Sequence, residues 1–239
     1  AREIQISMDG EINIPEVIGS LIATNPEAMI FSIEGFVGAS PELLVSRSGD
    51  LVQAHPLAGT AIRLADEEQD QKSMADLLDS AKDHYEHRIT IEWLLNELLP
   101  FCSYVDADPK PKILSLPNVH HLGSSVNGHL SLPAASVLEL VAALHPTPAV
   151  GGNPQSTAIE LISKIEKINR GLYAGPVGWV DAKGNGSFAV GIRSAQIVGS
   201  KAQLFAGVGI VNDSDPQSEL EETYGKFQTM QTAILSTIS

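Results

Sequence analysis

Two carboxylates and an ammonium group recur along one flank of the last helix that the sequence predicts. This helix begins at Pro216, with Asp215 as the residue that caps it. Glu219, Glu222 and Lys226 follow at i, i+3 and i+7, so they share one face. Beside them runs a stripe that we expect to pack against a core, formed by Leu220, Tyr224, Phe227, Gln231 and Ile234.

A second acidic face is predicted on a long helix over residues 74–99. Asp83, Glu86 and Thr90 repeat the same spacing. Two such faces meeting across a cleft would offer oxygen ligands, which suit Mg²⁺ better than Zn²⁺. On spacing alone, two solvent-exposed acidic faces are the simpler explanation. The opposite face of this helix is a mostly apolar stripe of Leu77, Ala81, Tyr85, Arg88 and Leu95.

Glycines and one arginine mark a further candidate site. The sequence predicts an antiparallel meander over residues 176–211, in which Arg193 lies on the same strand face as Gly191. Gly207 and Gly209 share a face of the next strand. Glycines weaken a strand unless something must approach its backbone, and an Arg beside such a space can grip a carboxylate. Tight sheet packing with a surface Arg explains the pattern equally well.

Isolated residues could also carry chemistry. Glu42 directly follows a loop predicted over residues 35–41. It is either a turn carboxylate or a general acid whose pKa is raised by burial. A second loop of small residues is predicted over 55–63. His120 and His121 are adjacent, and a lone His is more often structural than catalytic. No glycine-rich nucleotide motif or Cys/His zinc spacing occurs.

Composition narrows the class of protein. The chain has 239 residues, 43% of them hydrophobic, which is enough for one sizeable core. Its net charge of −14 and lack of Lys/Arg runs argue against nucleic acid and membrane surfaces as partners. Cys102 is the only cysteine, so no internal disulfide can form and a reducing, cytoplasmic location is expected. No apolar run approaches the length of a membrane span.

Predicted elements come in blocks, which favours an α+β fold of antiparallel sheets with helices packed outside. Strands are expected over 2–8, 29–33 and 43–46, and helices over 15–23, 133–144 and 154–167, with Asn153 capping the last. Ser73, with Asp76 three residues later, matches a capping box that would open the helix over 74–99.

Seven segments together resemble the chorismate-utilising enzymes, which include isochorismate, salicylate, anthranilate and aminodeoxychorismate synthases. They occur in the family's order over nearly the whole chain. The segments are Phe36–Leu44 (FVGASPELL), Pro56–Ala61 (PLAGTA), Ala81–His87 (AKDHYEH), His121–Gly123 (HLG), Leu144–Ala149 (LHPTPA), Gly178–Asp181 (GWVD) and Leu204–Val211 (LFAGVGIV).

The resemblance implies roles for particular residues. Glu86 and Glu222 match glutamates that bind Mg²⁺, which holds the ring carboxylate of chorismate, and Asp83 and Glu219 match acidic neighbours acting through water. Glu42 matches the acid that protonates the departing C4 hydroxyl. Groups matching those that contact the substrate are Gly59, Thr60, His121, Tyr173, Arg193, Gly207, Gly209 and Lys226.

One residue separates members of this family. Lyase members carry Thr where this chain has Ala149, so release of pyruvate is expected to be disfavoured. The resemblance therefore implies isomerisation of chorismate to isochorismate, with salicylate synthase activity as the alternative. It leaves open whether the product feeds menaquinone, a catechol siderophore or salicylate.

The family's general base is a Lys in a Lys-Val-Val-Leu-(Ala/Ser)-Arg motif. Ala1 and Arg2 match its last two residues, so we expect the Lys upstream of residue 1. Residues 1–239 are accordingly expected to form a chorismate-binding domain, the C-terminal portion of a longer enzyme. We expect the chain to be a monomer, with the N-terminal segment of the longer enzyme as the one protein segment that would associate with it. A fragment that binds Mg²⁺ and chorismate without turnover is the alternative.

Overall fold

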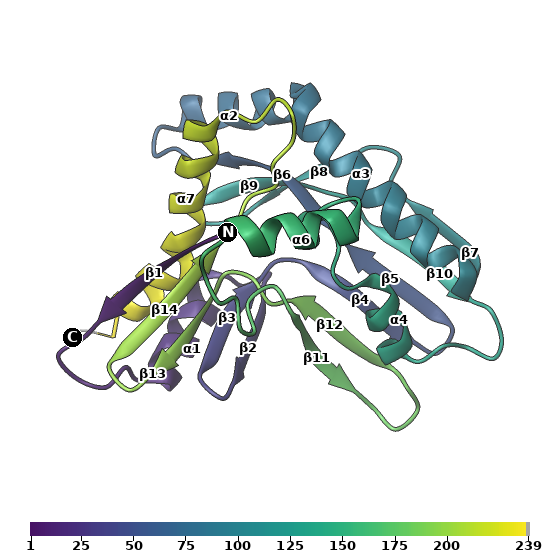
Figure 1. Ribbon diagram of the computed structural model, residues 1–239, viewed down its shortest axis with the longest axis horizontal. Helices are drawn as coiled ribbons and strands as arrows, with labels where there is room; N and C mark the ends of the chain where they lie inside the picture. Colours follow the sequence, from purple (N-terminus) through teal and green to yellow (C-terminus); the bar gives the residue numbers. More distant parts are fainter. Residues whose placement is uncertain (238–239) are drawn as a thin grey trace.

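The computed structural model describes residues 1–237, and it has the α+β architecture that the sequence predicts: antiparallel sheets with helices packed outside (Figure 1). The first sheet has the strand order β1-β14-β13-β3-β2. Its strands are β1 (Arg2–Ser7), β2 (Met29–Ile33), β3 (Phe36–Ser40), β13 (Ser194–Val198) and β14 (Lys201–Ala206).

Two further sheets complete the framework. The larger has the order β11-β12-β4-β5-β10-β7, and the smaller has the order β6-β9-β8. The larger contains β4 (Leu43–Ser48), β5 (Leu51–His55), β7 (Cys102–Ala107), β10 (Val126–Leu130), β11 (Pro176–Val180) and β12 (Gly186–Val190). The smaller contains β6 (Leu57–Ile62), β8 (Lys112–Ser115) and β9 (Val119–Gly123).

Helices cover these sheets in separate groups. Helices α1 and α7 contact each other and the first sheet, α4 packs on β4, and α2 and α3 pack on β6 and β9. Figure 1 shows α6 lying across the front of the molecule, beside the N-terminus. The helices are α1 (Ile14–Thr24), α2 (Glu67–Asp79), α3 (Ala81–Leu98), α4 (Val137–Leu144), α5 (Pro148–Gly151), α6 (Gln155–Ile165) and α7 (Pro216–Leu235), with a 3₁₀ turn at Leu99–Phe101.

Two main hydrophobic clusters hold the layers together. One joins α1 and α7 to the first sheet and includes Leu21, Leu204 and Phe227. The other joins α3 and α4 to the larger sheet and includes Leu94 and Leu144. Both clusters consist of side chains that the solvent hardly reaches, so burial of apolar area fixes each helix on its sheet.

The single helix predicted over 74–99 is wrong, because the chain breaks at Ser80. Ser80 has extended backbone angles (φ −69°, ψ 110°) and caps α3 through its hydroxyl, which accepts from the Asp83 amide at 3.2 Å. The capping box expected at Ser73 is also wrong, since Ser73 lies inside α2. Both serines have an Asp three residues later, but only Ser80 caps a helix.

Predicted faces and ends of other helices need correction. Tyr85 and Arg88 of α3 face solvent, whereas Thr90 is buried. Tyr224 of α7 is 52% exposed, and the buried face includes Glu219 and Lys226. Helix α4 begins at Val137 and not at residue 133, because Ser136 and Glu139 form a capping box. Helix α6 has Pro154 and not Asn153 at its cap position.

Two segments predicted as loops are strands. Residues 36–40 form β3, which is buried along its whole length between β2 and β13. Residues 57–62 form β6, which pairs with β9. Small residues, which we expected to mark loops, permit close packing in these strands instead.

The meander predicted over 176–211 is divided between two sheets. Strands β11 and β12 belong to the larger sheet, and β13 and β14 belong to the first. Residues 191–193 connect the sheets, so Gly191 and Arg193 lie on no common strand face. Gly207 and Gly209 follow the end of β14 and lie in a loop.

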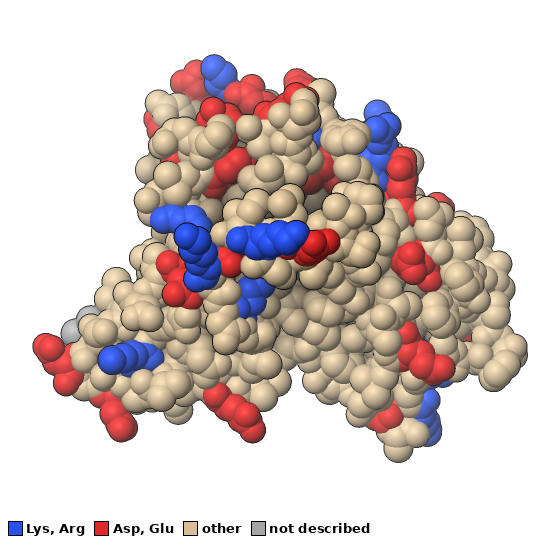
Figure 2. Space-filling model, in the orientation of Figure 1, with Lys and Arg blue, Asp and Glu red and all other residues tan. Residues whose placement is uncertain are grey.

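Charge is unevenly spread over the surface. The face in Figure 2 carries acidic side chains along its top and lower edges, while Lys and Arg side chains gather near its middle. Within residues 1–237, every helix is too short or too polar to cross a bilayer.

Removing the α3 cap tests the break at Ser80. We expect Ser80→Ala to lower the free energy of unfolding by about 1 kcal/mol, because the first turn of α3 loses a hydrogen-bond acceptor. The control Ser156→Ala, on the exposed surface of α6, should change it by less than about 0.5 kcal/mol. Equal losses in urea unfolding of the two variants would contradict this assignment of the cap.

Candidate active site

A cavity of about 730 Å³ opens where the three sheets approach one another. Its walls come from β6, β9, α3, α5, α6 and the loops that follow β12 and β14. Most of the residues predicted for the site line it. They are Glu42, Gly59, Thr60, Glu86, His121, Ala149, Tyr173, Arg193, Gly207, Gly209 and Lys226.

Three predicted site residues do not line this cavity. Asp83 accepts a hydrogen bond from Ser80 and lines a second cavity, whose walls come from β6, α2 and the start of α3. Glu219 is buried and pairs with Lys82 at 2.6 Å. Glu222 pairs with Lys226 at 2.5 Å. Of the three partners, only Lys226 lines the cavity, so Glu222 is the one that adjoins the cavity through its partner.

Arg193 is the central cation of the cavity. It is 6% exposed, and its backbone has a positive φ of 51°, which is unusual for a residue other than glycine. Its guanidinium donates to Nε2 of His121. No carboxylate within residues 1–237 lies at ion-pair distance from it. The cation is therefore available to an anionic ligand.

His121 is a neutral partner of this cation. Burial first, and then the charges of Arg193 and Lys226, lower its pKa well below the usual value. Because a guanidinium can only donate, Nε2 must accept and Nδ1 must carry the hydrogen. Nδ1 lies 3.0 Å from the Thr60 hydroxyl and 3.2 Å from the Gly59 carbonyl oxygen, which can accept from it.

Gly59 interrupts the ladder between β6 and β9. The register shifts between Ala58 and Thr60, and Gly59 has a φ of +80°. A Cβ atom at this position would lie 2.9 Å from the Cβ of Asp83. Glycine therefore permits both the bulge and the close approach of α3 to the cavity wall.

Lys226 supplies the second cation. Its ammonium group donates to the Gly207 carbonyl oxygen at 2.9 Å and pairs with Glu222 one helical turn away. Gly207 and Gly209 belong to the loop after β14, which lies against α3 and Tyr173. A Cβ at Gly209 would collide with the carboxylate of Glu86, so only glycine leaves room for that carboxylate.

Tyr173 forms the far wall of the cavity. Its ring stacks on Phe205, with centroids 5.2 Å apart, and burial raises its pKa to about 12. The phenol therefore stays protonated and can donate a hydrogen bond to a ligand. Ala149, at the start of α5, presents only a methyl group to the cavity.

Glu42 is the buried carboxyl group of the site. It is 3% exposed, and burial raises its pKa to about 7, although the Leu57 amide, Arg193 and Lys226 act in the opposite direction. A carboxyl group with a pKa near neutrality can both hold and release a proton at physiological pH.

Glu86 and Glu222 are the candidate ligands for a divalent cation. Burial raises the pKa of Glu86 to about 7, and the negative charges of Glu222 and Asp83 raise it further against the effect of Lys226 and Lys82. Oxygen Oε2 of the nearby Glu219 is buried without a hydrogen-bond partner within residues 1–237. That part of the chain holds no cluster of three or more ligating side chains. Mg²⁺ does not need one, since it commonly takes one or two carboxylates with waters and substrate oxygens.

One wall of the cavity was not predicted from the sequence. Helix α6 contributes an apolar stripe at i, i+3, i+4 and i+7, and this spacing was a signal that could have identified it. The stripe consists of Ala158, Leu161, Ile162 and Ile165.

A cavity with two fixed cations, a carboxyl group of raised pKa and an acidic pair defines an enzyme-like site for a small anion. Comparison with known proteins identifies the family. The sequence matches the family model "Chorismate binding enzyme" over residues 1–235. The chain therefore belongs to the chorismate-binding enzyme family, and the resemblance inferred from its motifs is confirmed.

Individual relatives agree with this assignment. The chain is 42% identical to isochorismate synthase MenF of Bacillus subtilis (strain 168) over 238 residues, covering 98% of this chain and 50% of that protein. It is 46% identical to isochorismate synthase DhbC of the same organism over 245 residues, covering 98% and 62%. The solved structure of a putative 2,3-dihydroxybenzoate-specific isochorismate synthase, DhbC from Bacillus anthracis, has a TM-score of 0.92 at 38% identity, covering 97% of this chain and 64% of that one. The chain thus spans about half to two thirds of the length of these relatives.

The raised pKa of Glu42 can be measured directly. We expect its carboxyl ¹³C signal to titrate near pH 7, while that of Glu139, which accepts from the Ser136 amide, titrates below its usual pKa. Between about pH 4.5 and 7 the folded state binds more protons at Glu42 than the unfolded state. Protonation of Glu42 therefore contributes to the free energy of unfolding. This contribution is fully present below pH 4.5 and is lost as the pH rises through 7, which lowers the free energy of unfolding by about 3 kcal/mol. Titration of Glu42 near 4.5 would contradict the assigned role.

Proposed function

We propose that this chain carries the site for Mg²⁺-dependent isomerisation of chorismate to isochorismate. The observation that carries the proposal is the buried guanidinium of Arg193, which has no carboxylate partner within residues 1–237 and lies in a cavity lined by Lys226 and Glu42. Chorismate is a small dianion, so it provides the charge that this site lacks. The family to which the chain belongs supports the same substrate.

Substrate binding in this proposal uses groups of fixed charge. Arg193 can grip a carboxylate with parallel N–H donors, and the Tyr173 hydroxyl can donate beside it. Lys226 is held by Glu222 and by the carbonyl of Gly207, so it is already oriented when the substrate arrives. The apolar wall formed by α6 would exclude water from the ring.

Glu42 is assigned the proton transfer at C4. Its raised pKa keeps a fraction of the carboxyl groups protonated at neutral pH, so the group can give a proton to the departing hydroxyl, which leaves as water. Arg193 and Lys226 oppose the raised pKa through their positive charges, and these same charges stabilise the carboxylate that remains.

A base must remove a proton from the water that adds at C2. The family assigns this step to a Lys that precedes the residues matching Ala1 and Arg2. Arg2 is opposite Ala206 in the pairing of β1 with β14. A residue that extended β1 backwards in this register would pass along the loop of Gly207 and Gly209, at the cavity wall. The register therefore supports a base supplied from that direction.

Mg²⁺ would be held by Glu86 and Glu222, with Asp83 and Glu219 acting through water. When bound, the ion neutralises negative charge beside the ring carboxylate of the substrate. Lys226 would remain beside both carboxylates, where its charge offsets the repulsion between them.

Proton NMR of chorismate incubated with the chain and Mg²⁺ tests the proposal. We expect isochorismate ring signals from a chain extended upstream to include the base, and much slower conversion or none from residues 1–239 alone. We expect no pyruvate from either, because Ala149 offers no hydroxyl for lyase chemistry. A matched variant, Ala149→Thr, should release detectable pyruvate. Chain extended upstream by about a hundred residues provides the comparison that includes the expected base.

Three outcomes would contradict parts of this account. If neither residues 1–239 nor the chain extended upstream changes chorismate, the proposed reaction is wrong. Conversion by the residues 1–239 alone, at the rate of the extended chain, would show that the base lies within them. Pyruvate from the unaltered chain would favour the salicylate synthase alternative.

A further inference from the structure

A second buried histidine lies outside the cavity, directly beside His121. His120 is 1% exposed and belongs to the same strand, β9. Successive side chains of a strand point to opposite faces, so His121 faces the cavity and His120 faces α2. None of the chemistry assigned above uses His120.

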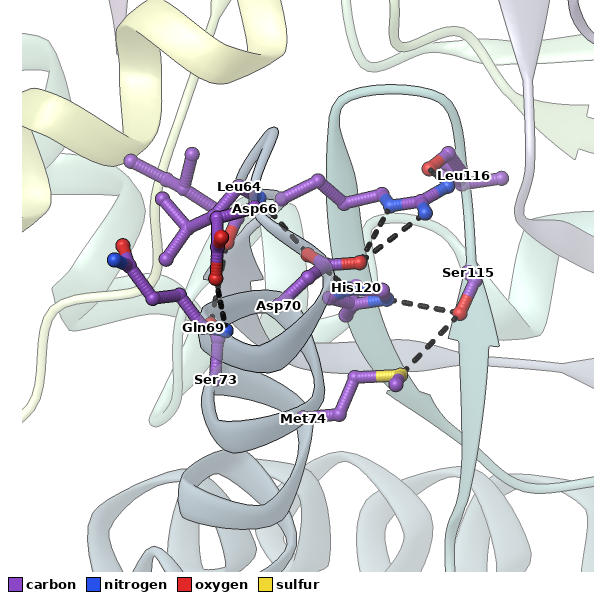
Figure 3. A network of polar contacts seen from close by, with 11 residues as sticks. Leu64, Asp66, Gln69, Asp70, Ser73, Met74, Ser115, Leu116 and His120 are labelled. Atoms are coloured by element: carbon purple, nitrogen blue, oxygen red, sulfur yellow. Dashed lines mark hydrogen bonds and ion pairs between the residues drawn. The ribbon is translucent and has the colours of Figure 1, made fainter.

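Both ring nitrogens of His120 are engaged. Nδ1 lies 2.8 Å from the hydroxyl oxygen of Ser115, and Nε2 lies 3.0 Å from Oδ1 of Asp70 (Figure 3). The bond to Asp70 is buried, and an ionised carboxylate can only accept, so Nε2 carries a hydrogen. The ring is therefore held between β8 on one side and α2 on the other.

Asp70 is fixed in turn by its other donors. The Leu64 amide donates to it at 2.8 Å, and Arg63 donates through Nε and Nη2 at 3.2 and 3.1 Å. These hydrogen bonds lower the pKa of Asp70 to about 2, the Leu64 amide having the largest effect. Ser73 of α2 also donates to the Ile62 carbonyl oxygen at the end of β6. Helix α2 thus holds both strands that carry Thr60 and His121.

The cavity needs an anchor of this kind. His121 meets Thr60 and the Gly59 carbonyl only if β9 keeps its position beside β6. The ladder between these strands is interrupted at Gly59, so backbone pairing is weakest where the geometry matters most. His121 in turn accepts from Arg193, so a shift of β9 would change the direction of the guanidinium.

We propose that His120 is a positioning residue, which anchors β9 to α2 through Asp70 and thereby holds His121 and Arg193 in place. The effect on turnover rests on the proposed function, whereas the anchoring itself does not. The buried network around Asp70 consists of Asp70, His120, Ser115 and Arg63.

Asp70→Asn is the direct test. The amide has one acceptor oxygen where the carboxylate has two, so His120 and Arg63 cannot both keep their partner. The readout is the pair of imidazole ¹⁵N signals of His121, which in the unaltered chain should report hydrogen on Nδ1. We expect these signals to shift or broaden in the variant. In the chain extended upstream to include the base, we also expect kcat/KM for chorismate to fall by about 10²-fold, since a displacement of about 1 Å has effects of that size.

Asp50→Asn is the matched control. Asp50 pairs with His129 at 3.4 Å, but both side chains are more than half exposed. His129 is on β10 of the larger sheet and Asp50 is in the turn between β4 and β5, so neither belongs to the sheet of His120. This variant should leave the His121 signals and the kinetics unchanged. If Asp70→Asn does not fold, Ser115→Ala replaces it. This change removes the contact to Nδ1 of His120 and a long contact of 3.9 Å to the Met74 sulfur, and it should give a smaller shift of the same kind.

The outcomes separate the two proposals. Folded Asp70→Asn or Ser115→Ala with unchanged His121 signals would overturn the positioning role. Shifted signals, with no conversion of chorismate even by the chain extended upstream, would support the anchor and count against the proposed function instead. Equal shifts in Asp50→Asn would also overturn the proposal, because the effect would not be specific to the buried network.

Discussion

The position of one buried cation constrains the whole molecule. Arg193 lies in the connection between the larger sheet and the first sheet, its backbone carbonyl accepts from Ala39 of β3 at 3.1 Å, and its side chain reaches His121 of the third sheet. Burial opposes its charge and lowers its pKa. An uncompensated buried charge is costly, so the surrounding structure must hold it in place, and it becomes a prepared site for an anion.

The rest of the cavity follows from the sign of the charges. The chain has a net charge of −14, so a dianionic substrate can bind only where local cations reverse the sign. Arg193 and Lys226 provide these cations, while burial raises the pKa of Glu42 to about 7 and so reduces its negative charge at neutral pH. Glu86 and Glu222 add negative charge next to Lys226, and this arrangement is what gives a divalent cation a role in the proposed reaction.

The sequence revealed the chemistry of the site better than its geometry. Motifs around Glu42, Glu86 and Gly209 were recognisable because the need for close backbone approach and charge restricts residue type. The break at Ser80 was missed because Ser73 matches the same capping pattern, and only packing on β6 decides between them. The left-handed backbone of Arg193 was also missed, since an alternating pattern continues through it. The anchor of His120 depends on Asp70, fifty residues away in sequence, and no local pattern predicts such contacts.

Calorimetry of chorismate binding, with and without Mg²⁺, tests the central claim that the acidic pair recruits a cation for the substrate. We predict that Mg²⁺ raises the affinity of the unaltered chain and has no effect on that of Glu222→Gln, while both keep the same far-UV circular dichroism. Glu221→Gln, on the exposed side of α7, should behave like the unaltered chain. An equal gain in affinity from Mg²⁺ in Glu222→Gln would contradict the assignment of Glu222 and with it the account of how this site binds its anion.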